Sequence, residues 1–108
     1  MTVIEDILTA SGVQYREARF PKPPSGTYAV YMDDVDTDGP DDMNMIRRHS
    51  YTIELYEPCP DIDSEAAIEA AIDAVGLRWT KQARYWIHSE QLYQAVYEFD
   101  YIEKKEAT

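Results

Sequence analysis

Cysteine is almost absent from this sequence: the 108 residues include only Cys59, which lies between Pro58 and Pro60. A single cysteine cannot form an intrachain disulfide, so a disulfide-stapled fold is excluded and a reducing compartment is expected. Only two histidines are available to assist Cys59, and a proline-flanked loop lacks the helix start that would activate a thiol. We therefore expect no catalytic cysteine.

Positive charge and long apolar runs are also scarce. Ten Lys and Arg stand against 21 Asp and Glu, a formal net charge of −11. Phosphate groups would repel such a surface, which argues against general binding to DNA or to an anionic membrane. There is no apolar run of about 18 residues, and the first residues lack a basic region. We expect neither a membrane span nor a standard secretion signal.

Patterns that carry known chemistry are missing as well. The sequence has no phosphate loop, nucleophile elbow or zinc-ligand spacing. Asp34, Asp36 and Asp38, followed by Gly39, match the start of a calcium loop, but Met45 stands where that loop needs a bidentate Glu. We interpret residues 33–42 as an acidic, solvated loop, and we expect no enzyme activity, no cofactor and no metal.

The clearest element present is a helix over residues 63–75, with Asp63 or Ser64 as its N-cap and Gly76 at its end. Its apolar stripe consists of Ile68, Ala71, Ile72 and Val75, which should pack on a sheet. Glu65, Glu69 and Asp73 recur every four residues away from that stripe. We interpret these three carboxylates as a solvated helix face.

The other elements follow from capping and alternation. A short helix begins at Thr2 with a capping box and ends at Ser11 and Gly12. Strands are predicted over residues 13–20, 27–32, 43–57, 77–87 and 92–102. The order α-β-β-β-α-β-β predicts an α+β fold, a mainly antiparallel sheet covered on one face by two helices. We expect one domain over residues 1–108, with residues 103–108 frayed.

Two groups of side chains are candidates for contacts with other subunits. Arg47 and Arg48, next to His49, form a basic cluster that could meet the Asp-rich loop of the same chain or of a neighbour, or lie in water. The Tyr-rich last strand is either core or an interface. The candidate interface residues are Asp33, Asp34, Asp36, Asp38, Asp41, Asp42, Arg47, Arg48, Tyr93 and Tyr97.

Several segments together resemble a known group of proteins. They are the opening helix, residues 28–31 (YAVY), 51–56 (YTIELY), 76–80 (GLRWT) and 89–98 (SEQLYQAVYE). With these segments the chain, from Thr2 to about Tyr101, resembles the small tail-completion or tail-terminator proteins of the neck of tailed bacteriophages and prophages. The Asp-rich segment 33–42 is not part of the resemblance.

The resemblance implies a virion protein without catalysis, made in the bacterial host cytoplasm. It implies a homo-oligomeric ring, commonly a hexamer, that caps the tail tube, contacts the tail tube protein and the head connector or neck protein, and lets DNA pass through its lumen. Two alternatives stay open: an acidic DNA mimic that inhibits a host DNA-binding protein, and a calcium-dependent binding module.

Overall fold

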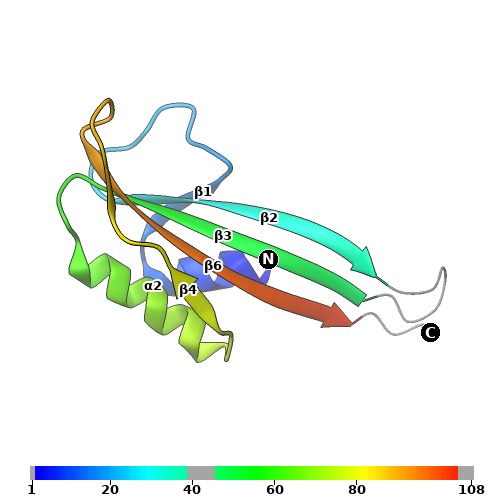
Figure 1. The fold of residues 1–108 in the computed structure, drawn as a ribbon. Helices are drawn as coiled ribbons and strands as arrows, with labels where there is room; N and C mark the ends of the chain where they lie inside the picture. Colours follow the sequence, from blue (N-terminus) through cyan, green and yellow to red (C-terminus); the bar gives the residue numbers. More distant parts are fainter. Residues whose placement is uncertain (1, 39–45, 105–108) are drawn as a thin grey trace.

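A computed structural model of the chain describes residues 2–38 and 46–104. It has an α+β fold with two helices and a mostly antiparallel sheet, as the sequence predicts (Figure 1). The elements are α1 (Val3–Ser11), β1 (Gln14–Glu17), β2 (Tyr28–Asp38), β3 (Ile46–Glu57), α2 (Ile62–Ala74), β4 (Trp79–Lys81), β5 (Tyr85–Ile87) and β6 (Leu92–Lys104). The strands are ordered β1-β2-β3-β6-β4, and β5 also pairs with β6.

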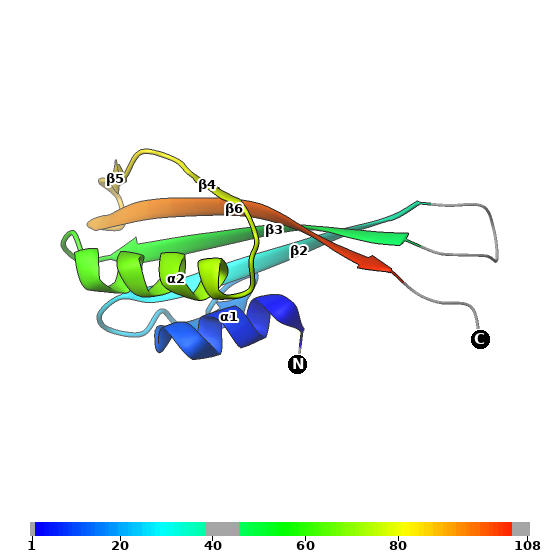
Figure 2. The ribbon, with the colours of Figure 1, turned by 90° about the horizontal axis from the view of Figure 1, so that it is seen from below.

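Both helices lie on the same face of the sheet, and the core fills the space between them and the strands (Figure 2). The alternation predicted for β3 and β6 is confirmed, because their inward-facing residues are buried. The core comprises Ile4, Ile7, Leu8, Ala29, Tyr31, Tyr51, Ile53, Leu55, Ile68, Ala71, Ile72, Ala95, Tyr97 and Phe99. None of the helices in the described ranges is long and apolar enough to cross a membrane.

The helix ends follow the capping rules, with one shift. The predicted capping box of α1 is present between Thr2 and Glu5. The N-cap of α2 is Asp61 rather than Asp63 or Ser64, because the Asp61 carboxylate accepts the backbone N–H of Ser64 at 3.1 Å. At the other end Gly76 adopts the left-handed conformation, as expected. Val75 falls outside the predicted stripe, being 48% exposed.

The strands depart from the prediction in two further places. β1 is shorter than residues 13–20 and pairs with β2 in parallel, the single parallel pair among the described strands. The strand predicted over 77–87 is two short strands, β4 and β5, which lie one after the other along the outer edge of β6. The interruption between them, residues 82–84, is where Arg84 leaves the sheet edge to meet a charged cluster described below.

The Asp-rich segment was wrongly predicted as a loop from Asp33 onward. β2 continues through Asp38, and β3 and β6 continue beside it, so three strands project past the helices (Figure 1). We call residues 33–38, 46–51 and 99–104 the arm. Residues 103 and 104, predicted to fray, belong to its β6 strand. The positions of Asp41, Asp42 and the predicted strand start at 43–45 lie outside the described residues.

Candidate assembly surfaces and the charge network behind them

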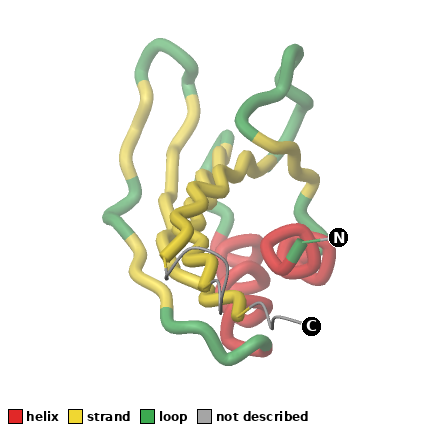
Figure 3. The backbone as a smooth tube through the Cα atoms, turned by 90° about the vertical axis from the view of Figure 1, so that its right-hand side faces the viewer, coloured by secondary structure: helices red, strands yellow, loops and turns green. Residues whose placement is uncertain are grey.

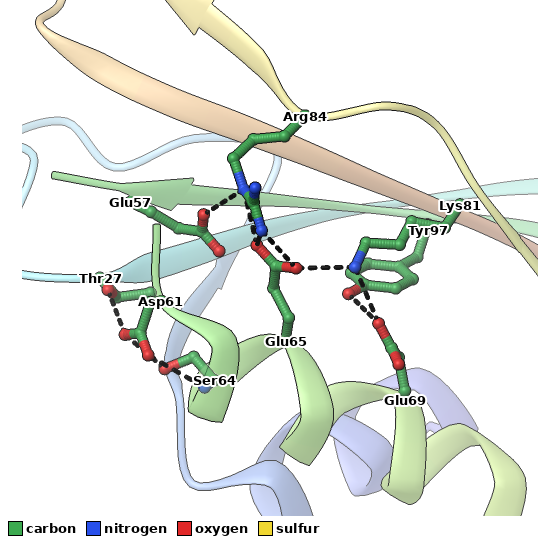
Figure 4. Close-up of polar contacts among 9 residues, drawn as sticks. All are labelled: Thr27, Glu57, Asp61, Ser64, Glu65, Glu69, Lys81, Arg84 and Tyr97. Atoms are coloured by element: carbon green, nitrogen blue, oxygen red, sulfur yellow. Dashed lines mark hydrogen bonds and ion pairs between the residues drawn. The ribbon is translucent and has the colours of Figure 1, made fainter. Parts of the chain in front are cut away.

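A cluster of charged side chains joins α2 to the end of β4 and to the segment between β4 and β5 (Figure 4). The Glu65 side chain is only 3% exposed and accepts hydrogen bonds from Lys81 Nζ at 2.6 Å and Arg84 Nη2 at 2.8 Å. Lys81 also reaches Glu69 at 3.0 Å, and the same Glu69 oxygen accepts the hydroxyl of Tyr97 at 2.7 Å. The predicted solvated face of α2 is therefore wrong: Glu65 and Glu69 bind cations. Separately, Asp73 accepts the indole N–H of Trp79 at 2.8 Å.

A second carboxyl, Glu57 at the end of β3, is fully buried beside this cluster. Within residues 2–38 and 46–104 neither of its side-chain oxygens has a hydrogen-bond partner, and Arg84 Nε lies 3.4 Å away. Burial raises the pKa of Glu57, and the adjacent Glu65 raises it further. Burial alone would raise the pKa of Glu65 too, but Glu57, Lys81 and Arg84 together hold it below its usual range. The pair therefore favours one neutral and one ionised carboxyl.

The cluster connects segments that lie far apart in the sequence. Its cations stand 16 and 19 residues after Glu65, on an edge segment that otherwise makes only short strand pairings. A spacing of that kind leaves no local pattern in the sequence, which is why periodicity alone missed it. The consequence is that α2, the end of β3 and the β4–β5 segment are held together by charge.

On its helix-side face the arm carries a histidine between two carboxylates. His49 Nδ1 lies 2.9 Å from Asp33, and its Nε2 lies 3.5 Å from Glu103. The ring also stacks on Tyr51, with centroids 5.3 Å apart, and Arg47 lies 3.9 Å from Glu103. The basic cluster thus meets the Asp-rich strand of its own chain, one of the arrangements that the sequence left open.

The opposite face of the arm is acidic and partly apolar. β2 places Asp34 and Asp36 there, and β6 places Asp100 and Ile102 there, with Arg48 of β3 between Asp36 and Ile102 in the register. Ile102 is 59% exposed. β1 pairs only as far as Tyr31 and β4 only as far as Phe99, so among the described strands both outer edges of the arm are unpaired. Unpaired edges of this kind are the usual place where another chain adds to a sheet.

A pocket of about 310 Å³ lies on the helix-free face, at the end of the sheet away from the arm. Figure 3 shows the β1–β2 connection and the β4–β5–β6 segment rising on the side opposite the helices. Residues from both segments line the pocket. Its lining includes Arg19, Phe20, Tyr28, Tyr56, Ile87, Ser89, Leu92 and one acidic residue, Glu90. The stacking of Tyr28 on Tyr56, with ring centroids 5.2 Å apart, gives it an aromatic floor.

A basic patch that the sequence reading missed borders this pocket. Arg16 on β1, and Arg19 and Lys22 on the following connection, are all exposed, and none has an ion pair with residues 2–38 or 46–104. With Glu17, the stretch 14–26 has a net charge of 3 − 1 = +2 in a chain of −11. The spacing of three residues between these cations made them look like isolated surface charges.

The structure also places the other residues that the sequence suggested for an interface or a metal site. Tyr97 is fully buried under α2, so its side chain cannot reach another subunit and its proposed interface role is wrong. Tyr93 is half-buried and packs on Trp86, with centroids 4.7 Å apart. Asp34, Asp36 and Asp38 lie on an extended strand, whereas a calcium loop must curl around its ion. Within the described residues no cluster of three or more His, Cys, Asp or Glu could hold a metal.

Comparison with known proteins shows a similarity of fold. No family model and no curated protein matches the chain. Among solved structures, the fold is similar to that of a chain from "Virion of native gene transfer agent (GTA) particle", with a TM-score of 0.65 at 18% sequence identity. The alignment covers 95% of this chain and 92% of that one. At this identity the likeness establishes that nearly the whole chain has the fold of a protein in that virion.

Proposed function

We propose that this chain is a non-enzymatic structural protein of a phage-type virion, and specifically a tail-terminator or tail-completion subunit of the neck. In this role copies of the chain form a ring, hexameric by the resemblance, on the end of the tail tube. The ring contacts the tube protein on one side and the head connector on the other, and DNA passes through its lumen.

The observation that carries the proposal is the fold shared with a virion chain over 95% of the sequence. It agrees with the resemblance to tail-terminator proteins, which rests on separate evidence, the residues of five segments. The arm adds a physical reason for assembly, because the unpaired edges of its described strands can pair with another chain. A net charge of −11 suits a channel that DNA must traverse without sticking.

Deletion of the gene, followed by electron microscopy of the particles, tests the proposal. We expect tails of abnormal length, or tails and filled heads that fail to join, and we expect the wild-type gene supplied in trans to restore joined particles. Normal infectious particles after deletion would refute the proposal. Replacing Asp34 and Asp36 by Asn is a milder variant that keeps the Asp33–His49 contact and should impair joining while leaving the fold intact.

A DNA mimic that occupies a host DNA-binding protein is the second candidate, and one observation favours it. The carboxylates are spread along two strands of the arm, Asp34 and Asp36 on β2 and Asp100 on β6, and are not gathered in one loop. A mimic needs charges distributed over a face in this way. Under this alternative, gene deletion leaves particles normal, and the purified chain competes with DNA for a host protein in a salt-dependent manner.

A further inference from the structure

The arm and the pocket are complementary surfaces at opposite ends of the same sheet. Leu92 lines the pocket, and Ile102 stands ten residues later on the same strand, roughly 33 Å away at the rise of a β-strand. The strands of the arm continue past the helices (Figure 1), and the pocket lies at the other end of the sheet, so the arm of one copy cannot fold back onto its own pocket. Any contact between the two surfaces therefore joins two copies of the chain.

We infer that the arm of one copy docks on the helix-free face of the next, with Ile102 in the aromatic pocket and the acidic residues of the arm against the basic patch. The inference rests on the proposed function for the choice of partner, a second copy. It adds which two surfaces meet and which residues hold them.

Apolar complementarity is the first support. Ile102 is 59% exposed on a strand of a small protein, and the pocket offers Phe20, Tyr28 and Tyr56 as apolar walls. Burying an aliphatic side chain in an apolar site is favourable in proportion to the apolar area removed from water. The Ile102 side chain lies on the same face of the arm as Asp100, so one docking motion brings both to the neighbour.

Charge complementarity is the second support and selects this partner over an arm of another copy. Direct pairing of two arm edges would bring the Asp residues of one β2 beside Asp100 of another β6, and like charges facing each other across strands are destabilising. Arg16, Arg19 and Lys22 lack carboxylate partners within the described part of their own chain. Asp100 or Asp34 on the arm of the docking copy supplies these carboxylate partners.

The contact is head-to-tail, because two different patches meet. Repeating such a contact closes into a ring when the rotation between copies divides a full turn, and otherwise builds a filament. The arm-to-pocket contact therefore generates the kind of assembly that the proposed function requires, with one arm and one pocket used per copy.

Crosslinking tests the contact directly. In a Cys59→Ser background, one preparation carries Ile102→Cys and another carries Ser89→Cys, which lines the pocket. Mixed and oxidised at high protein concentration, and in the presence of purified tails as a template, they should give a disulfide-linked dimer containing one copy of each. The matched control replaces Ser89→Cys with Ala70→Cys, an exposed position on α2, and should give no such dimer.

Charge reversal then identifies the ion pair. Arg19→Glu in the Ser89→Cys copy should lower the crosslink yield about tenfold, since it places two like charges against each other across the contact. Asp100→Arg in the Ile102→Cys copy should restore it. Three outcomes would overturn the inference. They are a crosslink to Ala70→Cys as strong as that to Ser89→Cys, a product made mostly of two Ile102→Cys copies, and no crosslink either at high protein concentration or with tails present. If the crosslink forms while gene deletion leaves particles normal, the contact stands and the proposed virion function fails.

Discussion

Removing Arg84 tests whether the buried charge network holds the fold together. In the Arg84→Met variant the aliphatic stem is kept and the guanidinium is lost. Glu65, 3% exposed, then loses three hydrogen bonds of 2.8–3.1 Å, and Glu57 loses its guanidinium neighbour at 3.4 Å. Both carboxyls stay buried, and Glu65 keeps one cation, Lys81 at 2.6 Å.

The expected cost follows from what remains after the change. Breaking a buried ion pair by removing one partner costs about 3–5 kcal/mol, because a charge is left behind without compensation. Here the cost is reduced, because Lys81 still neutralises Glu65 and because the Arg84 side chain is 29% exposed and gains some solvation when free. We expect a loss of about 2–4 kcal/mol in the free energy of unfolding.

Urea denaturation at neutral pH, followed by the fluorescence of Trp79 and Trp86, measures this loss. Arg78→Met is the matched control: Arg78 is exposed on the connection between α2 and β4, and its replacement should cost less than about 0.5 kcal/mol. A double variant, Glu65→Met with Arg84→Met, should lose less than the sum of its single variants, since a buried ion pair replaced by apolar side chains is close to neutral. If Arg84→Met and Arg78→Met are equally stable, the network is not an anchor and our reasoning is wrong.

Three further predictions concern the core, the pH response and the arm. Ile72→Ala should cost about 2–5 kcal/mol by urea denaturation, because Ile72 is fully buried, while Val75→Ala at a half-exposed site should cost much less; similar losses would contradict the burial. The pKa of Glu57 is raised above its ordinary value of 4.5, so its contribution to stability is present below that pH and is lost as pH rises through the folded-state pKa. Glu57→Gln should therefore gain stability relative to the wild type between about pH 5 and pH 9 in urea melts, and a difference that does not change with pH would refute this. Because β2 is extended through Asp38, EDTA should leave the melting temperature unchanged and millimolar calcium should raise it little; micromolar calcium affinity in a titration, with a clear melting shift, would contradict this.

Local patterns were sufficient to predict most of the elements. The capping box at Thr2, the left-handed Gly76 and the period-two burial along β3 and β6 depend on residues close together in sequence, and the structure has all three. These features fix the two helices, the hairpin strands and the face that each strand buries. The α+β class followed from them.

The errors came from contacts between distant residues. Asp is unfavourable in strands, so a run of Asp residues predicts a loop. In the structure β2 lies beside β3, whose residues opposite 35–37 are His49, Arg48 and Arg47, and this basic strand offsets the acidic one. Glu65 likewise looked solvated because its cations come from the β4–β5 segment. In both places tertiary pairing of opposite charges overrides a local preference.

The network and the assembly surface are linked through the β4–β5 segment. Arg84 is the residue before β5, and β5 ends at Ile87, which lines the pocket together with Ser89. β5 pairs with β6 over only three positions, so strand hydrogen bonds alone hold this side of the pocket weakly. The hydrogen bonds from Arg84 to the buried Glu65 attach the residue before β5 to α2. Loss of Arg84 should therefore weaken docking of an arm at this pocket, even in conditions where the fold survives, and the crosslink yield between Ile102→Cys and Ser89→Cys copies measures that effect apart from stability.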